Sequence, residues 1–268
     1  MILRDSTTIP VSKLSNIEET RNRKYKRDVS YKVVFGWLGQ GWRDLWTQPV
    51  PSLLYGVAVF LVSLVFIVYM YETGRDYFLF PALAGFMIVG PLVAAGLYLK
   101  SREIENGQRV SLRTMMTVRP LAGAQVFFTG MVLTMLMLLW MRAAVLIYAL
   151  FFGVRAFPGL DHVATMLITT PVGWAMLAVG SLIGSLFAGF AFAISVFSIP
   201  MLLDHKVDAM TAMGVSLAIV WNNLGPMLLW GAIVLALFLI CVATGLIGLI
   251  AIFPWLGHAT WHAYREMR

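Results

Sequence analysis

The most constraining feature of the sequence is a series of apolar runs of about twenty residues. The runs lie near 51–71, 78–99, 121–142, 172–198, 226–243 and 246–263. None of them contains an aspartate or a glutamate. A helix needs about 20 mostly apolar residues to cross the hydrocarbon core of a bilayer. The pattern therefore predicts an all-α, polytopic membrane protein with about six transmembrane helices.

Composition agrees with this class. Apolar residues make up 60% of the chain and charged residues 12%, where a soluble domain has about 45–50% and about 25%. The single cysteine, Cys241, cannot form an intrachain disulfide. The basic residues flank the apolar runs instead of forming a patch, so we expect the lipid bilayer as a partner and no nucleic acid. We see no cleavable signal peptide in the first 30 residues.

The distribution of charge predicts the orientation. With six spans and an inside N-terminus, the inside segments are 1–50, 100–120, 199–225 and the C-terminal tail. These segments hold 17 of the 20 Lys and Arg residues, as the positive-inside rule requires. We therefore expect both termini in the cytoplasm, a flexible basic tail over 1–34 and a single transmembrane domain over 35–268.

The region 226–263 allows one over-long helix or two short ones. Gly245 and Gly248 favour a tight turn between two helices, since glycine adopts backbone conformations that other residues avoid. We expect two spans.

An internal repeat is visible at the two ends of the domain. Residues 46–56 match 221–231 in the spacing of a tryptophan, a proline and a glycine, and Gly39 and Gly214 lie seven residues upstream of the tryptophans. The section 110–204 has the same order with loose identity. The sequence thus predicts three repeats of an interfacial helix plus a helical hairpin.

The interfacial helices are expected near 35–47 and 207–221, where apolar residues recur at helical spacing. A proline follows each of them and would begin the next span, where its missing N–H costs little. The alternative that 35–47 is a soluble lead-in stays open.

Catalytic signatures are missing from the sequence. It contains no Walker A loop, no Rossmann glycine fingerprint and no Cys/His cluster of the zinc type. Proton-coupled transporters usually keep a carboxylate at membrane depth, and none is present in the expected spans. We expect no enzyme activity and no cofactor.

Arg142 interrupts an apolar stretch near the far end of the third span. It could extend its side chain to the outer interface. Alternatively, it could be buried and bind an anionic lipid or substrate group.

His258 and His262 share one helix face at a spacing of four residues. Haem or copper could use this geometry. The alternative is a hydrogen-bonding role near the membrane interface.

The fourth span carries a row of small residues. Such rows let helix backbones approach closely, so we expect helix packing within the fold or against a partner. The row consists of Gly180, Gly184 and Ala188, with Ser181, Ser185 and Gly189 beside it.

Several segments resemble a known family. They are 51–56, 90–98, 198–204, 208–213, 223–230 and, most specifically, 257–265. They are similar to an uncharacterised family of bacterial inner-membrane proteins, a domain of unknown function sometimes labelled as a cytochrome c oxidase subunit. The resemblance implies a bacterial cytoplasmic membrane and no established activity. No catalytic residue carries over.

Three functional hypotheses follow. The first is a non-catalytic accessory subunit or assembly factor of a membrane complex, for example a respiratory complex. Its partner would be such a membrane protein complex or further copies of the same chain. The second is a permease or lipid-handling protein, since transporters often contain repeated hairpins; a permease predicts a polar cavity that reaches Arg142. The third is a haem or copper protein that uses His258 and His262.

Overall fold

The computed structural model describes residues 25–27, 29–118, 122–153 and 160–268. The described residues form helices and no strand, which confirms the predicted all-α class. The helices are α2 (Lys32–Thr47), α3 (Pro49–Glu72), η1 (Asp76–Phe78), α4 (Leu79–Val93), α5 (Ala95–Glu105), α6 (Leu112–Met116), α7 (Gly123–Phe152), α8 (Leu160–Thr169), α9 (Pro171–Ser195), α10 (Ser198–Asp204), α11 (Ala209–Asn222), α12 (Leu224–Ala243) and α13 (Leu249–Met267).

Five helical segments are long and apolar enough to cross a membrane. They are Pro49–Glu72, Pro81–Glu105, Gly123–Phe152, Pro171–Asp204 and Leu224–Ala243. The protein is therefore a multipass membrane protein, and five of the six expected runs coincide with these segments. The sixth run, expected at 246–263, forms α13, which is not among them because its second half is rich in polar side chains.

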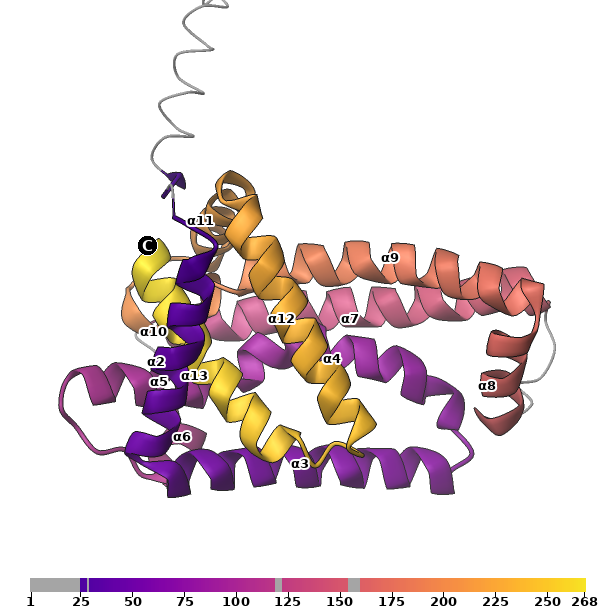
Figure 1. Ribbon diagram of the computed structural model, residues 1–268, viewed down its shortest axis with the longest axis horizontal. Helices are drawn as coiled ribbons and strands as arrows, with labels where there is room; N and C mark the ends of the chain where they lie inside the picture. The colour runs from indigo at the N-terminus through magenta and orange to yellow at the C-terminus, as the bar shows by residue number, and fades with distance from the viewer. Residues whose placement is uncertain (1–24, 28, 119–121, 154–159) are drawn as a thin grey trace, which may run out of the picture.

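Figure 1 shows that α3, α7 and α9 run along the long axis of the molecule, with α4 between α3 and α7. Helix α2 lies across one end of this layer, and α8 lies at the opposite end. The second span is interrupted at Ala94, between the end of α4 at Val93 and the beginning of α5 at Ala95. Pro91 lies inside α4 and removes one hydrogen bond from the helix before this interruption.

Two corners join the shorter helices α2 and α11 to the spans that follow. Gln48 separates α2 from α3 with φ −144° and ψ 79°, and Asn223 separates α11 from α12 with φ −133° and ψ 42°. Gln48 and Asn223 occupy the same position in the two matching segments, two residues after the shared tryptophan. Helices α2 and α11 thus match the expected segments 35–47 and 207–221 to within three residues, while their interfacial position and the three-fold repeat stay predictions.

The C-terminal helix α13 packs against α2, α3 and α5. Gly41 of α2 permits a close approach, since a Cβ there would lie 2.5 Å from the Ala259 backbone nitrogen. Trp37 and Trp261, both fully buried, belong to the hydrophobic core that also contains Ala259. Arg27 donates from Nε to the Met267 carbonyl oxygen at 3.2 Å, so the beginning of the described chain lies beside its end. Residues 1–24 of the expected tail lie outside the described residues.

Candidate functional site

A buried polar cluster fills the corner between α2, α3, α5 and α13. We call it the corner cluster; it consists of Asp44, Ser52, Lys100, Ser101, His258 and His262. Each of the four helices contributes at least one of these side chains. Five of the six residues are buried, and His262 is nearly so. Polar groups in such a place must satisfy one another, because each unpaired group costs about 1–3 kcal/mol.

Lys100 lies at the centre of the corner cluster with no exposed surface. Its ammonium group donates to the Gln48 carbonyl oxygen at 2.6 Å, to the Asp44 carbonyl oxygen at 3.5 Å and to Ser52 Oγ. The two carbonyls belong to the C-terminal end of α2, where a helix leaves acceptors unpaired and its dipole favours a cation. Lys100 therefore caps α2 and fixes the α2–α3 corner.

His258 has both ring nitrogens occupied. Ser52 Oγ lies 2.9 Å from Nε2, and Ser101 Oγ lies 2.8 Å from Nδ1. A metal could bind this histidine only after one serine had been displaced. Among the described residues, no group of three His, Cys, Asp or Glu side chains is placed to hold a metal.

His262 lies one helical turn further along α13 and connects the cluster to the surface. Its Nε2 lies 2.8 Å from Asp44 Oδ2, and its Nδ1 lies 3.9 Å from Glu105 Oε1. Burial alone would raise the pKa of Asp44, but hydrogen bonds from His262 and Ser101 lower it below its ordinary value. Asp44 is therefore held as a carboxylate at neutral pH.

The corner cluster contains residue types that can form a nucleophile and its base, since Ser52 contacts both Lys100 and His258. However, these three side chains have no exposed surface, and none of them lines a described cavity. A substrate therefore has no path to Ser52 in this conformation. The observed geometry supports a structural role, in which the cluster joins the first and last helices of the domain.

A large apolar cavity lies between α4, α7, α9, α12 and α13. Its volume is about 1110 Å³, which slightly exceeds the usual range of about 300–1,000 Å³ for small-molecule sites. None of its described lining residues is charged. The hypothesis of a permease for polar solutes predicts a polar cavity that reaches Arg142; this cavity is apolar, and Arg142 is not among its lining residues.

The small-residue row of α9 lies along this cavity; Gly180, Ser181, Gly184, Ser185, Ala188 and Gly189 all line it. Gly184 also meets a helix neighbour, because a Cβ there would lie 2.9 Å from the Trp140 ring. By contrast, a Cβ on Gly180 or Gly189 would have no atom within 4 Å. The row thus combines one close helix contact with an open wall, and its role in partner packing stays a prediction.

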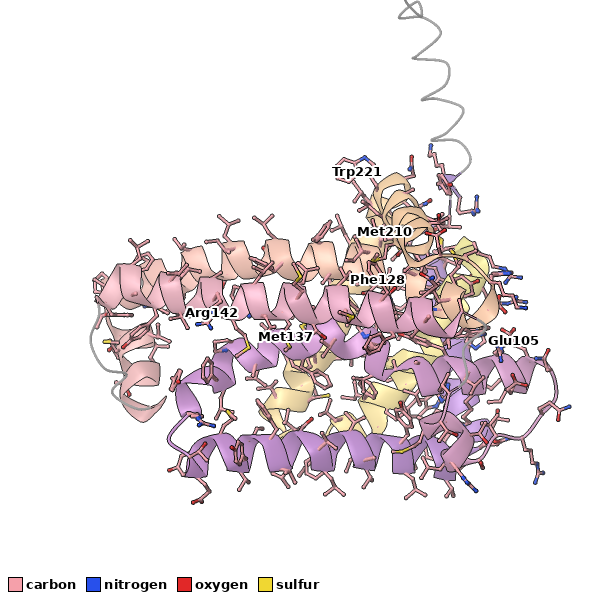
Figure 2. The ribbon with its side chains drawn as sticks, turned by 180° about the vertical axis from the view of Figure 1, so that it is seen from behind. Glu105, Phe128, Met137, Arg142, Met210 and Trp221 are labelled. Carbon is pink, nitrogen blue, oxygen red and sulfur yellow. The ribbon has the colours of Figure 1, made fainter. Side chains whose placement is uncertain are left out.

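Arg142 lies on the exposed surface of α7. It is the twentieth residue of this helix, in the part nearer α8 (Figure 2). Nineteen steps of about 1.5 Å place it about 28 Å from the beginning of α7, which is close to the thickness of the hydrocarbon core. The position fits a side chain that reaches the membrane interface.

Sequence reasoning missed four members of the corner cluster, Asp44, Ser52, Lys100 and Ser101. One signal was available. Asp44 continues the buried stripe of α2 formed by Val34, Trp37 and Gly41, and a carboxylate on the apolar face of a helix requires a partner.

Comparison with known proteins identifies one family. Residues 79–204, from α4 to α10, match the model of a family described as predicted integral membrane protein (DUF2189). The expected resemblance to an uncharacterised membrane protein family is confirmed over this part of the chain. The segment 257–265 lies outside the match. No curated protein and no solved structure gives a match.

Proposed function

We propose that this multipass membrane protein binds an uncharged, lipid-like molecule in its apolar cavity and does so without catalysing a reaction. The observation that carries the proposal is the cavity of about 1110 Å³ without a charged lining residue. Within a bilayer, a space of this kind is filled by hydrocarbon. A ligand that is charged inside the cavity would be unpaired there, at a cost of several kcal/mol.

The wall of the cavity offers a hydrogen bond to a neutral head group. Tyr98 lines the cavity and is 2% exposed. No hydrogen-bond partner for its hydroxyl is found in the described part of the chain. Thr260, also in the wall, uses its hydroxyl proton on the Leu256 carbonyl oxygen at 2.8 Å and can still accept a bond. Ligands with a long apolar chain and an ester, keto or hydroxyl group fit this wall.

The test uses variants that fill the cavity. Gly180→Leu and Gly231→Leu each place a side chain in the cavity, where a Cβ meets no atom within 4 Å. Gly214→Leu is the matched control, because Gly214 is also a helical glycine with open space around it but does not line the cavity.

The proteins are purified in mild detergent, and their bound lipids are identified by mass spectrometry. We expect a defined neutral lipid on the wild type and on Gly214→Leu, and at least a several-fold loss on the two filled variants. Equal lipid on all four proteins, or no retained lipid on the wild type, would refute the proposal.

A second function, that of an accessory subunit or homo-oligomer, is supported by α3. Its buried residues are Ser52, Gly56 and Val59, all in the first half of the helix. The second half presents large apolar side chains such as Val62 and Val65 on its surface. This half of α3 offers a free surface for a partner helix. Isolation at native level in mild detergent would test the role, and a chain that always elutes as a lone monomer would contradict it.

We further propose a bacterial cytoplasmic membrane with both termini on the cytoplasmic side. The distribution of Lys and Arg supports this orientation, and so does the contact between Arg27 and Met267. Reporter fusions at the two ends should give the same, cytoplasmic signal. Opposite signals would refute the orientation.

A further inference from the structure

We infer that α12 and α13 form a re-entrant hairpin, which enters the membrane from the side of the two chain ends and turns back inside the hydrocarbon. The segment Thr244–Gly248, here called the hairpin turn, joins the two helices. Three independent observations place this turn within the membrane: its depth, its backbone hydrogen bonds and its side chains. The inference is independent of the proposed ligand.

The depth of the hairpin turn follows from the contact between α13 and α3. A Cβ on Gly56 would lie 2.8 Å from the Ile250 carbonyl carbon, so the first turn of α13 rests on Gly56. Helix α3 continues for sixteen residues beyond Gly56, from 56 to its end at Glu72. At about 1.5 Å per residue this is about 24 Å. Figure 1 shows the hairpin turn beside the middle of α3, well short of the end where α8 lies.

The backbone N–H groups of the hairpin turn are all paired. Each N–H from 244 to 250 donates to an acceptor within the hairpin itself, over 2.7 to 3.3 Å. Most of these acceptors are carbonyls, and the Gly248 N–H instead donates to Thr244 Oγ1. Left-handed conformations at Gly245 and Leu246, with φ of 61° and 67°, make this closure possible. Hydrocarbon offers no water to unpaired N–H groups, so a turn inside a membrane requires such pairing.

The side chains of the hairpin turn suit a segment that is surrounded by lipid. Residues 244–248 contain no charge, and Ile247 is 61% exposed on the protein surface. By contrast, α3 ends with the charged residue Glu72, and the loop that follows carries Arg75. An exposed isoleucine at a tip without charges is stable in lipid and unfavourable in water.

The consequence is an asymmetric wall for the apolar cavity. Both arms of the hairpin line it, through residues such as Val234 and Phe253. Beyond the hairpin turn, the described lining residues include Pro81 of α4, Tyr148 of α7 and Leu167 of α8. The hairpin therefore contributes to the wall only as far as its turn, which lies inside the membrane.

Cysteine labelling tests the inference. In a Cys241→Ala background, single cysteines are placed at Ile247 in the hairpin turn, at Thr73 after α3 and at Lys206 after α10. All three positions are exposed on the protein surface. A membrane-impermeant maleimide is added to spheroplasts and to inside-out vesicles. We expect Thr73→Cys to react from one side, Lys206→Cys from the other, and Ile247→Cys from neither until the membrane is dissolved in denaturing detergent.

Reaction of Ile247→Cys from either aqueous side at the rate of the control cysteine on that side would overturn the inference. A lipid-soluble diazirine serves as the second measurement; its carbene inserts into side chains without needing a thiolate, so it should label residue 247 in the intact membrane. Failure of this reagent would also overturn it, since the exposed tip would then not contact lipid. The same three cysteines in the wild-type background, where Cys241 is buried, show whether Cys241→Ala disturbs the fold.

Discussion

Adding one methyl group at Gly56 is expected to destabilise the protein, whereas the same change at Gly231 should stabilise it slightly. The two glycines occupy matching positions in the segments 46–56 and 221–231. Each lies within a helix after a proline entry. Their surroundings differ, because Gly56 touches the Ile250 backbone while a Cβ on Gly231 would have no atom within 4 Å.

The magnitudes follow from these contacts. In Gly56→Ala the obstacle is backbone, 2.8 Å from the new Cβ at the Ile250 carbonyl carbon and 2.9 Å at its Cα. Side-chain rotation cannot relieve it, so the cost lies near the upper end of the usual 1–3 kcal/mol for overpacking. The gain in helix propensity offsets up to about 1 kcal/mol. We expect a net loss of about 2 kcal/mol for Gly56→Ala and a gain of up to about 1 kcal/mol for Gly231→Ala.

Thermal unfolding in a single detergent measures the difference. A change of 1 kcal/mol shifts Tm by about 2 °C in a chain of this size. Gly56→Ala should therefore lower Tm by about 4 °C, and Gly231→Ala should raise it by up to about 2 °C. Equal shifts in the same direction would refute the packing of the hairpin on α3 as the cause.

Three further predictions concern buried polar groups. Lys100→Met leaves two buried carbonyl oxygens without a donor and should destabilise by about 2–6 kcal/mol in chemical unfolding, while Lys206→Met, at an exposed site, should have no effect; equal effects would contradict the capping role. The pKa of Asp44 is lowered in the folded state, so its carboxylate stabilises the fold fully at pH values above the ordinary pKa of about 4. This stabilisation is lost as the pH falls through the pKa of the folded state. Tm should thus drop below about pH 4 in the wild type and less so in Asp44→Asn; identical pH profiles would contradict this. Tyr98→Phe should reduce the retained lipid about 2- to 10-fold by removing one hydrogen bond of about 0.5–1.5 kcal/mol, and unchanged retention would exclude Tyr98 from head-group binding.

The spans were predictable because each depends on its own residues. A run of apolar residues with a proline at its beginning predicts α3 to within two residues, since Pro49 stands at the first helical position. The same reasoning predicts the bounds of helix α12, Leu224–Ala243, to within two residues. It is weaker for α13, whose polar residues His258 and His262 are paired by α2, α3 and α5. Those partners lie 157 to 218 residues away in sequence, and local patterns do not show them.

The role of Lys100 could not be derived from its neighbours in sequence. At the end of a span it looks like one of the charges that orient the protein. Its burial depends on the corner at Gln48, which brings two α2 carbonyls to the ammonium group. The cavity was hidden for a similar reason. The spacing of Gly180 and Gly184 predicts a smooth helix face, but it does not say whether a helix or hydrocarbon covers that face.

The pairing of α2 with α13 also has a consequence for how the protein is made. The ribosome synthesises α2 first, while its partner α13 begins 202 residues after α2 ends, from 47 to 249. At about 5–20 residues per second, this interval lasts about 10–40 s. During this time Asp44 and Trp37 lack the partners His262 and Glu266. The corner can therefore close only after α13 has been synthesised, and a chain that ends before α13 keeps Asp44 and Trp37 without these partners.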